Sequence, residues 1–188
     1  MSRFAAYALL ATLPALPAAA EIQPYAGQDA RDVASLSAAD VQAILAGEGW
    51  GLAKPAELNG YPGPAHVLEL AEELELTDEQ TASVEAIHDE MTRAAMTAGA
   101  EYVASEEHLT KMFRAGHAEP DMLAALLQSS ANALSRLREV HLAAHLAVTP
   151  LLSDDQKETY ARLRGYGGGT GGARRCRPRP PAALIKEA

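Results

Sequence analysis

Apolar residues recur with a helical period in the second half of the chain. At 100° per residue, an apolar arc of about 80° holds six residues of one segment: Leu123, Leu127, Leu134, Leu137, Val148 and Leu152. A second stripe lies earlier in the chain and comprises Val84, Ile87, Met91, Ala95, Ala98 and Tyr102. Gly116-His117-Ala118 separates the stripes, and Pro120 suits the first turn of a helix. The pattern predicts two long helices, about 77–115 and 120–148, folded as an antiparallel hairpin.

Shorter helices are predicted around this hairpin. One covers about residues 65–75, and another covers about 153–165, after Pro150 interrupts the pattern. A short N-terminal helix begins after Ser37, whose hydroxyl can cap the free amides of its first turn, and ends at Gly47. We therefore expect an all-α fold, with a four-helix hairpin domain over residues 64–166. Residues 21–63 form an N-terminal extension with one short helix and a loop rich in glycine and proline.

The two ends of the chain have their own signatures. Arg3 is followed by an uncharged apolar stretch over residues 4–16, and Ala18-Ala19-Ala20 supplies the small residues that signal peptidase recognises. We expect residues 1–20 to be a signal peptide cleaved after Ala20, which predicts a periplasmic protein without stable membrane insertion. An uncleaved N-terminal anchor is the alternative. Residues 167–188 are rich in Gly, Pro and Arg, and we expect a disordered basic tail.

Charge and composition narrow the classes of function. The chain carries 16 basic and 25 acidic residues, so its net charge is −9. Residues 21–166 carry 10 basic and 24 acidic residues and residues 167–188 carry 5 and 1, so the body is at −14 and the tail at +4. An acidic body argues against nucleic-acid binding. Cys176 is the single cysteine, so an intramolecular disulfide is excluded. Cys176 either forms a disulfide between two chains or has no structural role. With no catalytic signature in the chain, we expect a protein that is not an enzyme.

Two helix starts share one motif. Leu76-Thr77-Asp78-Glu79-Gln80 and Leu152-Ser153-Asp154-Asp155-Gln156 are both capping boxes, each with a leucine before the cap. This pair resembles the LTxxQ motifs of small periplasmic stress proteins, a family that includes the Spy and CpxP proteins, ZraP and the CnrX-like heavy-metal sensors. The second copy has Ser in place of Thr and keeps the hydroxyl. The resemblance covers about residues 64–165 and implies a helical hairpin fold, often a homodimer, that acts as a chaperone, a metal binder or a stress sensor.

His141 and His145 are the leading candidates for chemistry. Both fall inside the apolar arc of the 120–148 helix, and two histidines at i, i+4 can bind one metal ion together. The alternative is structural, with one ring packed in the core and the other hydrogen-bonded to a carboxylate or water. Imidazole and carboxylate ligands suit Zn, Ni, Co or Cu(II) rather than Ca or Mg. The CnrX-like relatives are similar in placing a histidine, and a second ligand four residues later, on this helix.

Further ligands are predicted from the other helices. If the hairpin turns near His117, position i faces roughly position 235 − i in an antiparallel pair, which puts His88 one turn from His145. His66 opens the 65–75 helix, with Glu69 and Glu73 on its face at i+3 and i+7. The predicted site is His141 and His145 with either His88 or the set of His66, Glu69 and Glu73. The chain lacks the N-terminal HxxxH of the CnrX-like sensors and the His-rich tail of the zinc-binding relatives.

Three functions remain open at this point. The first is a metal-binding protein of envelope stress or heavy-metal resistance, with Zn, Ni, Co or Cu as the ion. The second is an ATP-independent holdase chaperone whose partners are unfolded proteins and which works through exposed apolar and charged surface. The third is the regulatory partner of a stress-sensing system, which needs only the fold. The resemblance to the LTxxQ proteins also implies a homodimer.

Overall fold

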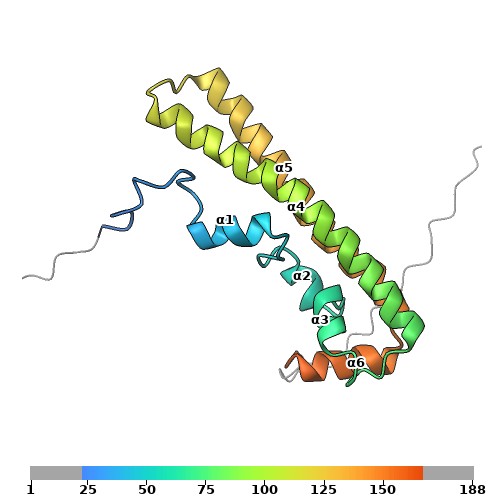
Figure 1. Ribbon diagram of the computed structural model, residues 1–188. Coiled ribbons are helices and arrows are strands. Elements are labelled where there is room, and N and C mark those ends of the chain that lie inside the picture. Colours follow the sequence, from blue (N-terminus) through green and yellow to red (C-terminus); the bar gives the residue numbers. More distant parts are fainter. Residues whose placement is uncertain (1–22, 167–188) are drawn as a thin grey trace, which may run out of the picture.

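The computed structural model describes residues 23–166, and these residues form helices and turns without a β-strand (Figure 1). In chain order the elements are α1 (Ala38–Leu45), α2 (Lys54–Glu57), α3 (Pro64–Glu69), α4 (Asp78–Arg114), α5 (Pro120–Val148), a 3₁₀ turn η1 (Thr149–Leu151) and α6 (Asp154–Leu163). The predicted all-α fold is confirmed. The predicted signal peptide, the basic tail and Cys176 lie outside the described residues. Among the described helices, none combines the length and the apolar character that a bilayer span requires.

The hairpin of α4 and α5 is the longest feature of the described structure. α4 has 37 residues and α5 has 29, and Gly116, with a φ of +71°, lies in the turn that joins them. The register can be read from two side-chain contacts: Ser130 donates a hydrogen bond to Glu106, and Arg136 Nη2 donates to Glu101 Oε2 at 2.7 Å. The predicted register pairs Glu106 with residue 129 and Glu101 with residue 134. The observed partners therefore lie one and two residues from the predicted ones.

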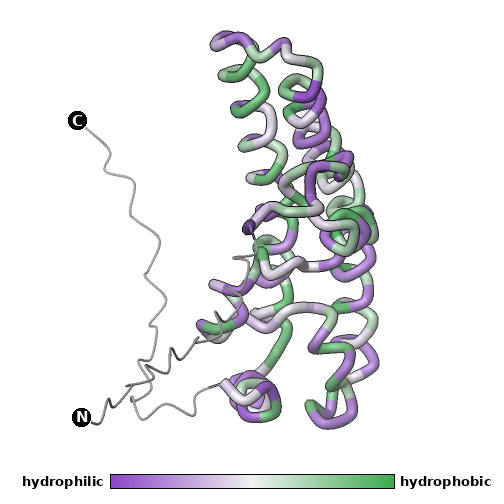
Figure 2. Tube along the Cα trace, turned by 90° about the vertical axis from the view of Figure 1, so that its left-hand side faces the viewer, coloured by the Kyte–Doolittle hydropathy of each residue, from purple (hydrophilic) through white to green (hydrophobic). Residues whose placement is uncertain are grey.

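The remaining helices cover part of this hairpin. α1, α2 and α3 follow one another along one side of it, and α6 crosses its base (Figure 1). The segment before α1 continues toward the tip, where Thr110 Oγ1 accepts from the Ala34 amide at 3.1 Å and Arg114 donates to the Arg31 carbonyl at 2.7 Å. The end of the hairpin that contains the α4–α5 turn projects beyond these elements (Figure 2). The hairpin thus has a covered base and middle, and its turn projects beyond the residues that contact the N-terminal segment.

The interior consists of two apolar clusters. The upper cluster joins the N-terminal segment and α1 to the hairpin, and its buried members are Val33, Leu36, Ile44, Ala95, Ala98, Tyr102, Ala133 and Leu137. The lower cluster joins α3, α6 and the base, and its buried members are Val67, Leu74, Val84, Val148, Leu152 and Tyr160. α5 contributes to both clusters through one stripe, since Leu137 belongs to the upper and Val148 to the lower. The residues of α5 between these two positions lie where the clusters separate.

Two short helices differ from the prediction. α3 ends at Glu69, whereas the sequence predicts a helix to about residue 75. Turns follow it to Glu75, which adopts a left-handed conformation with a φ of +49°. This turn buries Leu74 in the lower cluster and reverses the chain before the start of α4. The second difference is α2, which lies within the segment predicted to be a loop and has Pro55 in its first turn.

The two capping boxes predicted from the sequence are both present, and they are joined to each other. Thr77 and Ser153 each cap a helix, and the side-chain oxygens of Gln80 and Gln156 accept from the cap amides. Gln80 Nε2 donates to Gln156 Oε1 at 2.9 Å, and Gln156 Nε2 donates to Gln80 Oε1 at 3.0 Å. Each amide also reaches a backbone carbonyl: Leu151 for Gln80, and Leu74 for Gln156. The paired motif therefore fastens the starts of α4 and α6 together at the base.

Removing either glutamine is expected to destabilise the base of the hairpin. Gln80→Leu and Gln156→Leu should each lower the free energy of unfolding by about 1–3 kcal/mol, because the remaining amide and carbonyls lose their partners in a half-buried place. The double variant should lose less unfolding free energy than the sum of the two single losses, since the second change removes a group that is already unpaired. Denaturant unfolding measures this, with Gln128→Leu on the exposed face of α5 as the control. Strictly additive losses would contradict a direct Gln80–Gln156 contact.

Gly99 marks the place where α1 crosses α4. A Cβ atom at this position would lie 2.6 Å from the Ile44 carbonyl oxygen and 2.8 Å from Ile44 Cγ2. Within a helix, replacing Gly by Ala ordinarily stabilises by about 1 kcal/mol. Here we expect Gly99→Ala to lower the free energy of unfolding by about 1–3 kcal/mol, because backbone cannot move aside as a flexible side chain can. Gly49→Ala, with nothing within 4 Å of the new atom, is the control. A Gly99→Ala protein as stable as wild type would show that α1 does not dock there.

Candidate metal-binding site

Two histidines occupy core positions of α5 between the two apolar clusters. His141 is 2% exposed and His145 is 7% exposed. Along the helix they continue the stripe that runs from Leu137 to Val148, where apolar residues would pack best. Burying polar rings without full hydrogen bonding costs free energy, so their presence in this stripe calls for a physical reason.

Both rings line one cavity of about 570 Å³ between α5 and the segment from Gly49 to His66, which contains α2 and the start of α3. His66 and Glu57 line it as well, so three of the candidate histidines and one carboxylate face a common space. Trp50 and Met91 contribute apolar surface to the same walls. The cavity thus combines an apolar lining with a few polar groups, which is the usual character of a ligand site.

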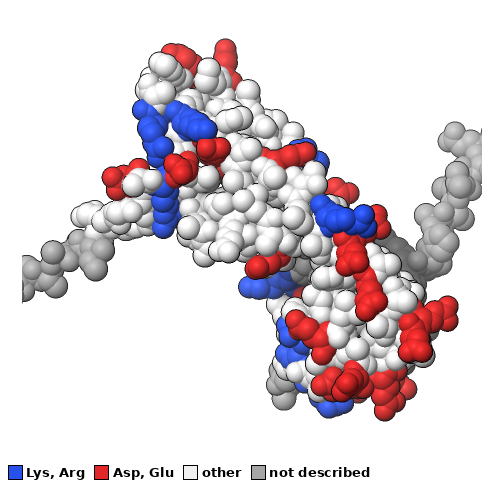
Figure 3. All heavy atoms as spheres, viewed as in Figure 1, with Lys and Arg blue, Asp and Glu red and all other residues white. Residues whose placement is uncertain are grey.

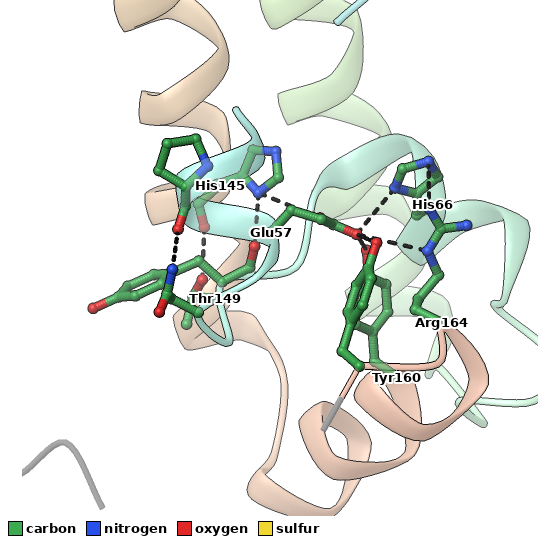
Figure 4. A network of polar contacts seen from close by, with 10 residues as sticks. Glu57, His66, His145, Thr149, Tyr160 and Arg164 are labelled. Carbon is green, nitrogen blue, oxygen red and sulfur yellow. Dashed lines mark hydrogen bonds and ion pairs between the residues drawn. The ribbon is translucent and has the colours of Figure 1, made fainter. Parts of the chain in front are cut away.

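The ring of His145 is held in a defined orientation (Figure 4). Its Nδ1 lies 2.7 Å from the carbonyl oxygen of Tyr61, and because a carbonyl only accepts, Nδ1 carries the proton. Nε2 then carries the lone pair. The ring also lies against Gly63, where a Cβ atom would stand 2.8 Å from Nε2, so the close approach requires a glycine. A histidine whose second nitrogen donates to a backbone carbonyl is the usual arrangement of a metal ligand.

His141 lacks a hydrogen-bond partner at one ring atom. Its Nε2 is buried and contacts no donor or acceptor among the described residues. Burial, followed by the nearby imidazole of His145, lowers the pKa of His141 below its ordinary value. The ring is therefore neutral at neutral pH, and one of its nitrogens has a free lone pair. The two imidazoles, one helical turn apart, both line the cavity and are its candidate ligands.

Glu57 is the centre of a polar network at the side of the cavity (Figure 4). Its Oε1 accepts hydrogen bonds from the hydroxyls of Tyr160 and Tyr166 and lies 3.6 Å from Arg164 Nε. Burial, and then the bond to Glu57, raises the pKa of Tyr160. Tyr160 is consequently a hydrogen-bond donor throughout the physiological range. Glu57 Oε2 is buried without a hydrogen-bond partner and lies 3.7 Å from His145 Nδ1.

Both ring nitrogens of His66 make contacts within this network. Arg164 Nη2 lies 3.2 Å from Nε2, and since arginine only donates, Nε2 is an acceptor. Nδ1 then carries the proton and points to Glu57 Oε1 at 3.3 Å. With both nitrogens engaged, His66 holds Glu57 in place and offers no free lone pair to the cavity.

The structure brings together only part of the predicted set of ligands. His141, His145 and His66 line the cavity, but Glu69 and Glu73 are exposed and do not. Glu69 is the last residue of α3, and Glu73 lies in the turns that follow, so they do not share a helix face with His66 as predicted. His88 is half-exposed on α4 beside Asp89 and also lies outside the cavity. Glu57, which the sequence analysis did not single out, takes the place of the predicted carboxylates.

The cavity does not present a complete set of metal ligands from the protein. Within residues 23–166, no three side chains of His, Cys, Asp or Glu are grouped closely enough to hold a metal ion. The two α5 histidines are the candidate ligands that line the cavity, and Glu57 Oε2, although it has no hydrogen-bond partner, is buried. An ion held here would receive two ligands from the protein, His141 and His145.

Comparison with known proteins adds no identification. No protein-family model matches the chain, and neither a curated protein nor a solved structure is similar enough to match it. The resemblance to the LTxxQ stress proteins therefore stays a prediction that rests on the two motifs.

Proposed function

We propose that this protein binds one divalent transition-metal ion in the cavity beside α5, as a non-enzymatic protein of envelope stress or heavy-metal resistance. The observation that carries the proposal is the placement of His141 and His145. Both are buried in a core stripe, both line one cavity, and the ring of His145 is oriented by the Tyr61 carbonyl as metal ligands commonly are. A purely structural role would be served better by apolar residues at both positions.

The charge of the molecule favours the approach of a cation. Acidic side chains gather at the base, around α6 and the start of α4 (Figure 3). Exposed members of this group include Glu72, Glu73, Asp78 and Glu79. Such a surface raises the local concentration of divalent cations without binding any of them specifically. The two imidazoles fit Zn, Ni, Co or Cu(II) as the ion.

The test is metal uptake by the mature chain, which begins at Glu21. The protein is equilibrated separately with Zn, Ni, Co and Cu salts and dialysed, and the bound metal is measured. We expect about one ion per chain for at least one metal. The same metal should raise the midpoint of thermal unfolding, since saturation at 100 times the dissociation constant stabilises by about 2.7 kcal/mol. A protein that retains none of the four metals would refute the proposal.

A holdase chaperone of the periplasm is the second candidate, and exposed apolar residues near the hairpin turn favour it. Phe113, Met122 and Leu127 are 56%, 48% and 50% exposed, which leaves apolar surface available to unfolded clients. The test is whether the metal-free protein suppresses aggregation of a denatured client. Suppression that is lost when these three residues are replaced by Ser would support this function. The homodimer and the regulatory role stay predictions, and sedimentation of the purified chain tests the first of them.

A further inference from the structure

The cavity is far larger than a metal ion requires. Its volume is about 570 Å³, whereas each water of a hydrated ion occupies about 30 Å³. Cavities of about 300–1,000 Å³ ordinarily hold small organic molecules. An ion bound to the α5 histidines would leave most of this space free for a molecule of that size.

The protein also supplies too few donors to complete the coordination of an ion. Transition metals take four to six ligands, whereas no three side chains of His, Cys, Asp or Glu in residues 23–166 are grouped closely enough to hold an ion, and His141 and His145 are the candidate ligands that line the cavity. The nitrogens of His66 are both engaged by Arg164 and Glu57. At least two coordination positions must therefore be filled from outside the protein.

The wall of the cavity carries one cation suited to a carboxylate. Lys54, at the start of α2, lines the cavity and makes no ion pair with any residue in the described part of the chain. Glu57 is the only acidic residue of the lining, and Arg164 and two tyrosine hydroxyls compensate its Oε1. Trp50 and Leu58 add apolar surface beside Lys54. These walls suit an organic anion better than they suit bulk water, because they combine a cation with apolar surface.

We propose that the cavity takes its metal as a complex with a small carboxylate chelator, whose free carboxylate pairs with Lys54. The two histidines occupy two coordination positions of the ion, and oxygen or nitrogen atoms of the chelator occupy others. This inference rests on the proposed metal-binding function and adds the chemical class of the second ligand. Citrate and L-histidine are suitable probes, because each binds divalent transition metals and carries a carboxylate.

The experiment measures both components in one preparation. The mature protein is dialysed against Ni²⁺ with radiolabelled citrate or L-histidine, and bound metal and bound chelator are determined together. We expect about one chelator per bound ion for at least one probe, and no retention of chelator without Ni²⁺. Lys54→Met should weaken retention of the chelator about tenfold, as expected for loss of a charge-assisted contact. Lys111→Met, on the far end of α4, is the matched control and should retain it as wild type does.

The outcomes separate the inference from the proposed function. Binding of Ni²⁺ while both chelators are excluded, or removal of the metal by them, would overturn the inference and leave the metal site standing. Equal retention of chelator in the Lys54 and Lys111 variants would overturn the assigned contact. Absence of Ni²⁺, Zn²⁺, Co²⁺ and Cu²⁺ from the protein, with and without chelator, would overturn the proposed function itself.

Discussion

His141→Ala and His145→Ala are each expected to abolish stoichiometric metal uptake. Each change removes one of the two buried imidazoles that line the cavity. Loss of an outer partner of a metal ligand already weakens affinity by about 10–100-fold, so loss of a ligand itself should exceed about 100-fold. Dialysis followed by metal analysis measures the effect, and thermal unfolding with and without metal measures it independently.

Two further variants separate ligation from folding. His117→Ala, in the exposed turn of the hairpin, is the control and should take up metal as wild type does. His141→Leu keeps the bulk of the side chain and removes a buried polar atom that has no partner. Its metal-free form should be at least as stable as wild type, while its metal uptake should be lost. Uptake that survives in both the His141 and the His145 variants would rule out the proposed site.

Glu57→Ala is expected to produce the largest loss of stability among the residues around the cavity. The Glu57 side chain is 10% exposed, and its Oε1 contacts the hydroxyls of Tyr160 and Tyr166 as well as Arg164. Removing it leaves a buried hydroxyl and a guanidinium without their partner, which should lower the free energy of unfolding by about 2–4 kcal/mol. Denaturant unfolding of the metal-free protein measures the change.

The controls for this prediction come from the same protein. Glu69→Ala removes an exposed carboxylate at the end of α3 and should change stability by less than about 0.5 kcal/mol. Glu57→Gln keeps an acceptor for Tyr160 and should recover part of the loss. If Glu57→Ala were no more destabilising than Glu69→Ala, the network would not contribute to the stability of the fold.

The long elements of the fold could be predicted because each has strong local signals. α4 and α6 begin at capping boxes, α5 has proline in its first turn, and Gly116 lies in the turn between the long helices. The apolar stripes are long enough for their period to be unambiguous. The placement of His141 and His145 in the interior followed from the same stripe, since a residue inside an apolar arc is carried to the buried face of its helix.

The end of α3 could not be predicted in the same way. Residues 65–75 contain no glycine or proline, and local propensity favours a helix throughout. The helix nevertheless ends at Glu69, because Leu74 packs in the lower cluster and Glu75 adopts a φ of +49°. The burial of Leu74 depends on residues of α4 and α6, which belong to the same cluster. The misplaced Glu73 is a direct consequence, since the face it was expected to share with His66 is interrupted.

Glu57 was missed for a different reason. α2 has four residues, too few for a periodic pattern, and it lies between glycine-rich stretches that indicate a loop. The proline in its first turn was the one local signal of a helix. The partner that gives Glu57 its role, Tyr160, is 103 positions away in the chain. A contact of this kind arises from the folded arrangement of α2 and α6 and has no signature in either segment alone.

The most direct test of the metal site is anomalous diffraction from a crystal of the chain from Glu21 onward, grown with the metal that it retains best. The proposal predicts one strong anomalous peak in the cavity, about 2.0–2.2 Å from a ring nitrogen of His141 and of His145. With a carboxylate chelator present, electron density for that molecule should extend from the ion toward Lys54. A peak at the acidic base alone, or no peak near the two histidines, would contradict the proposed site.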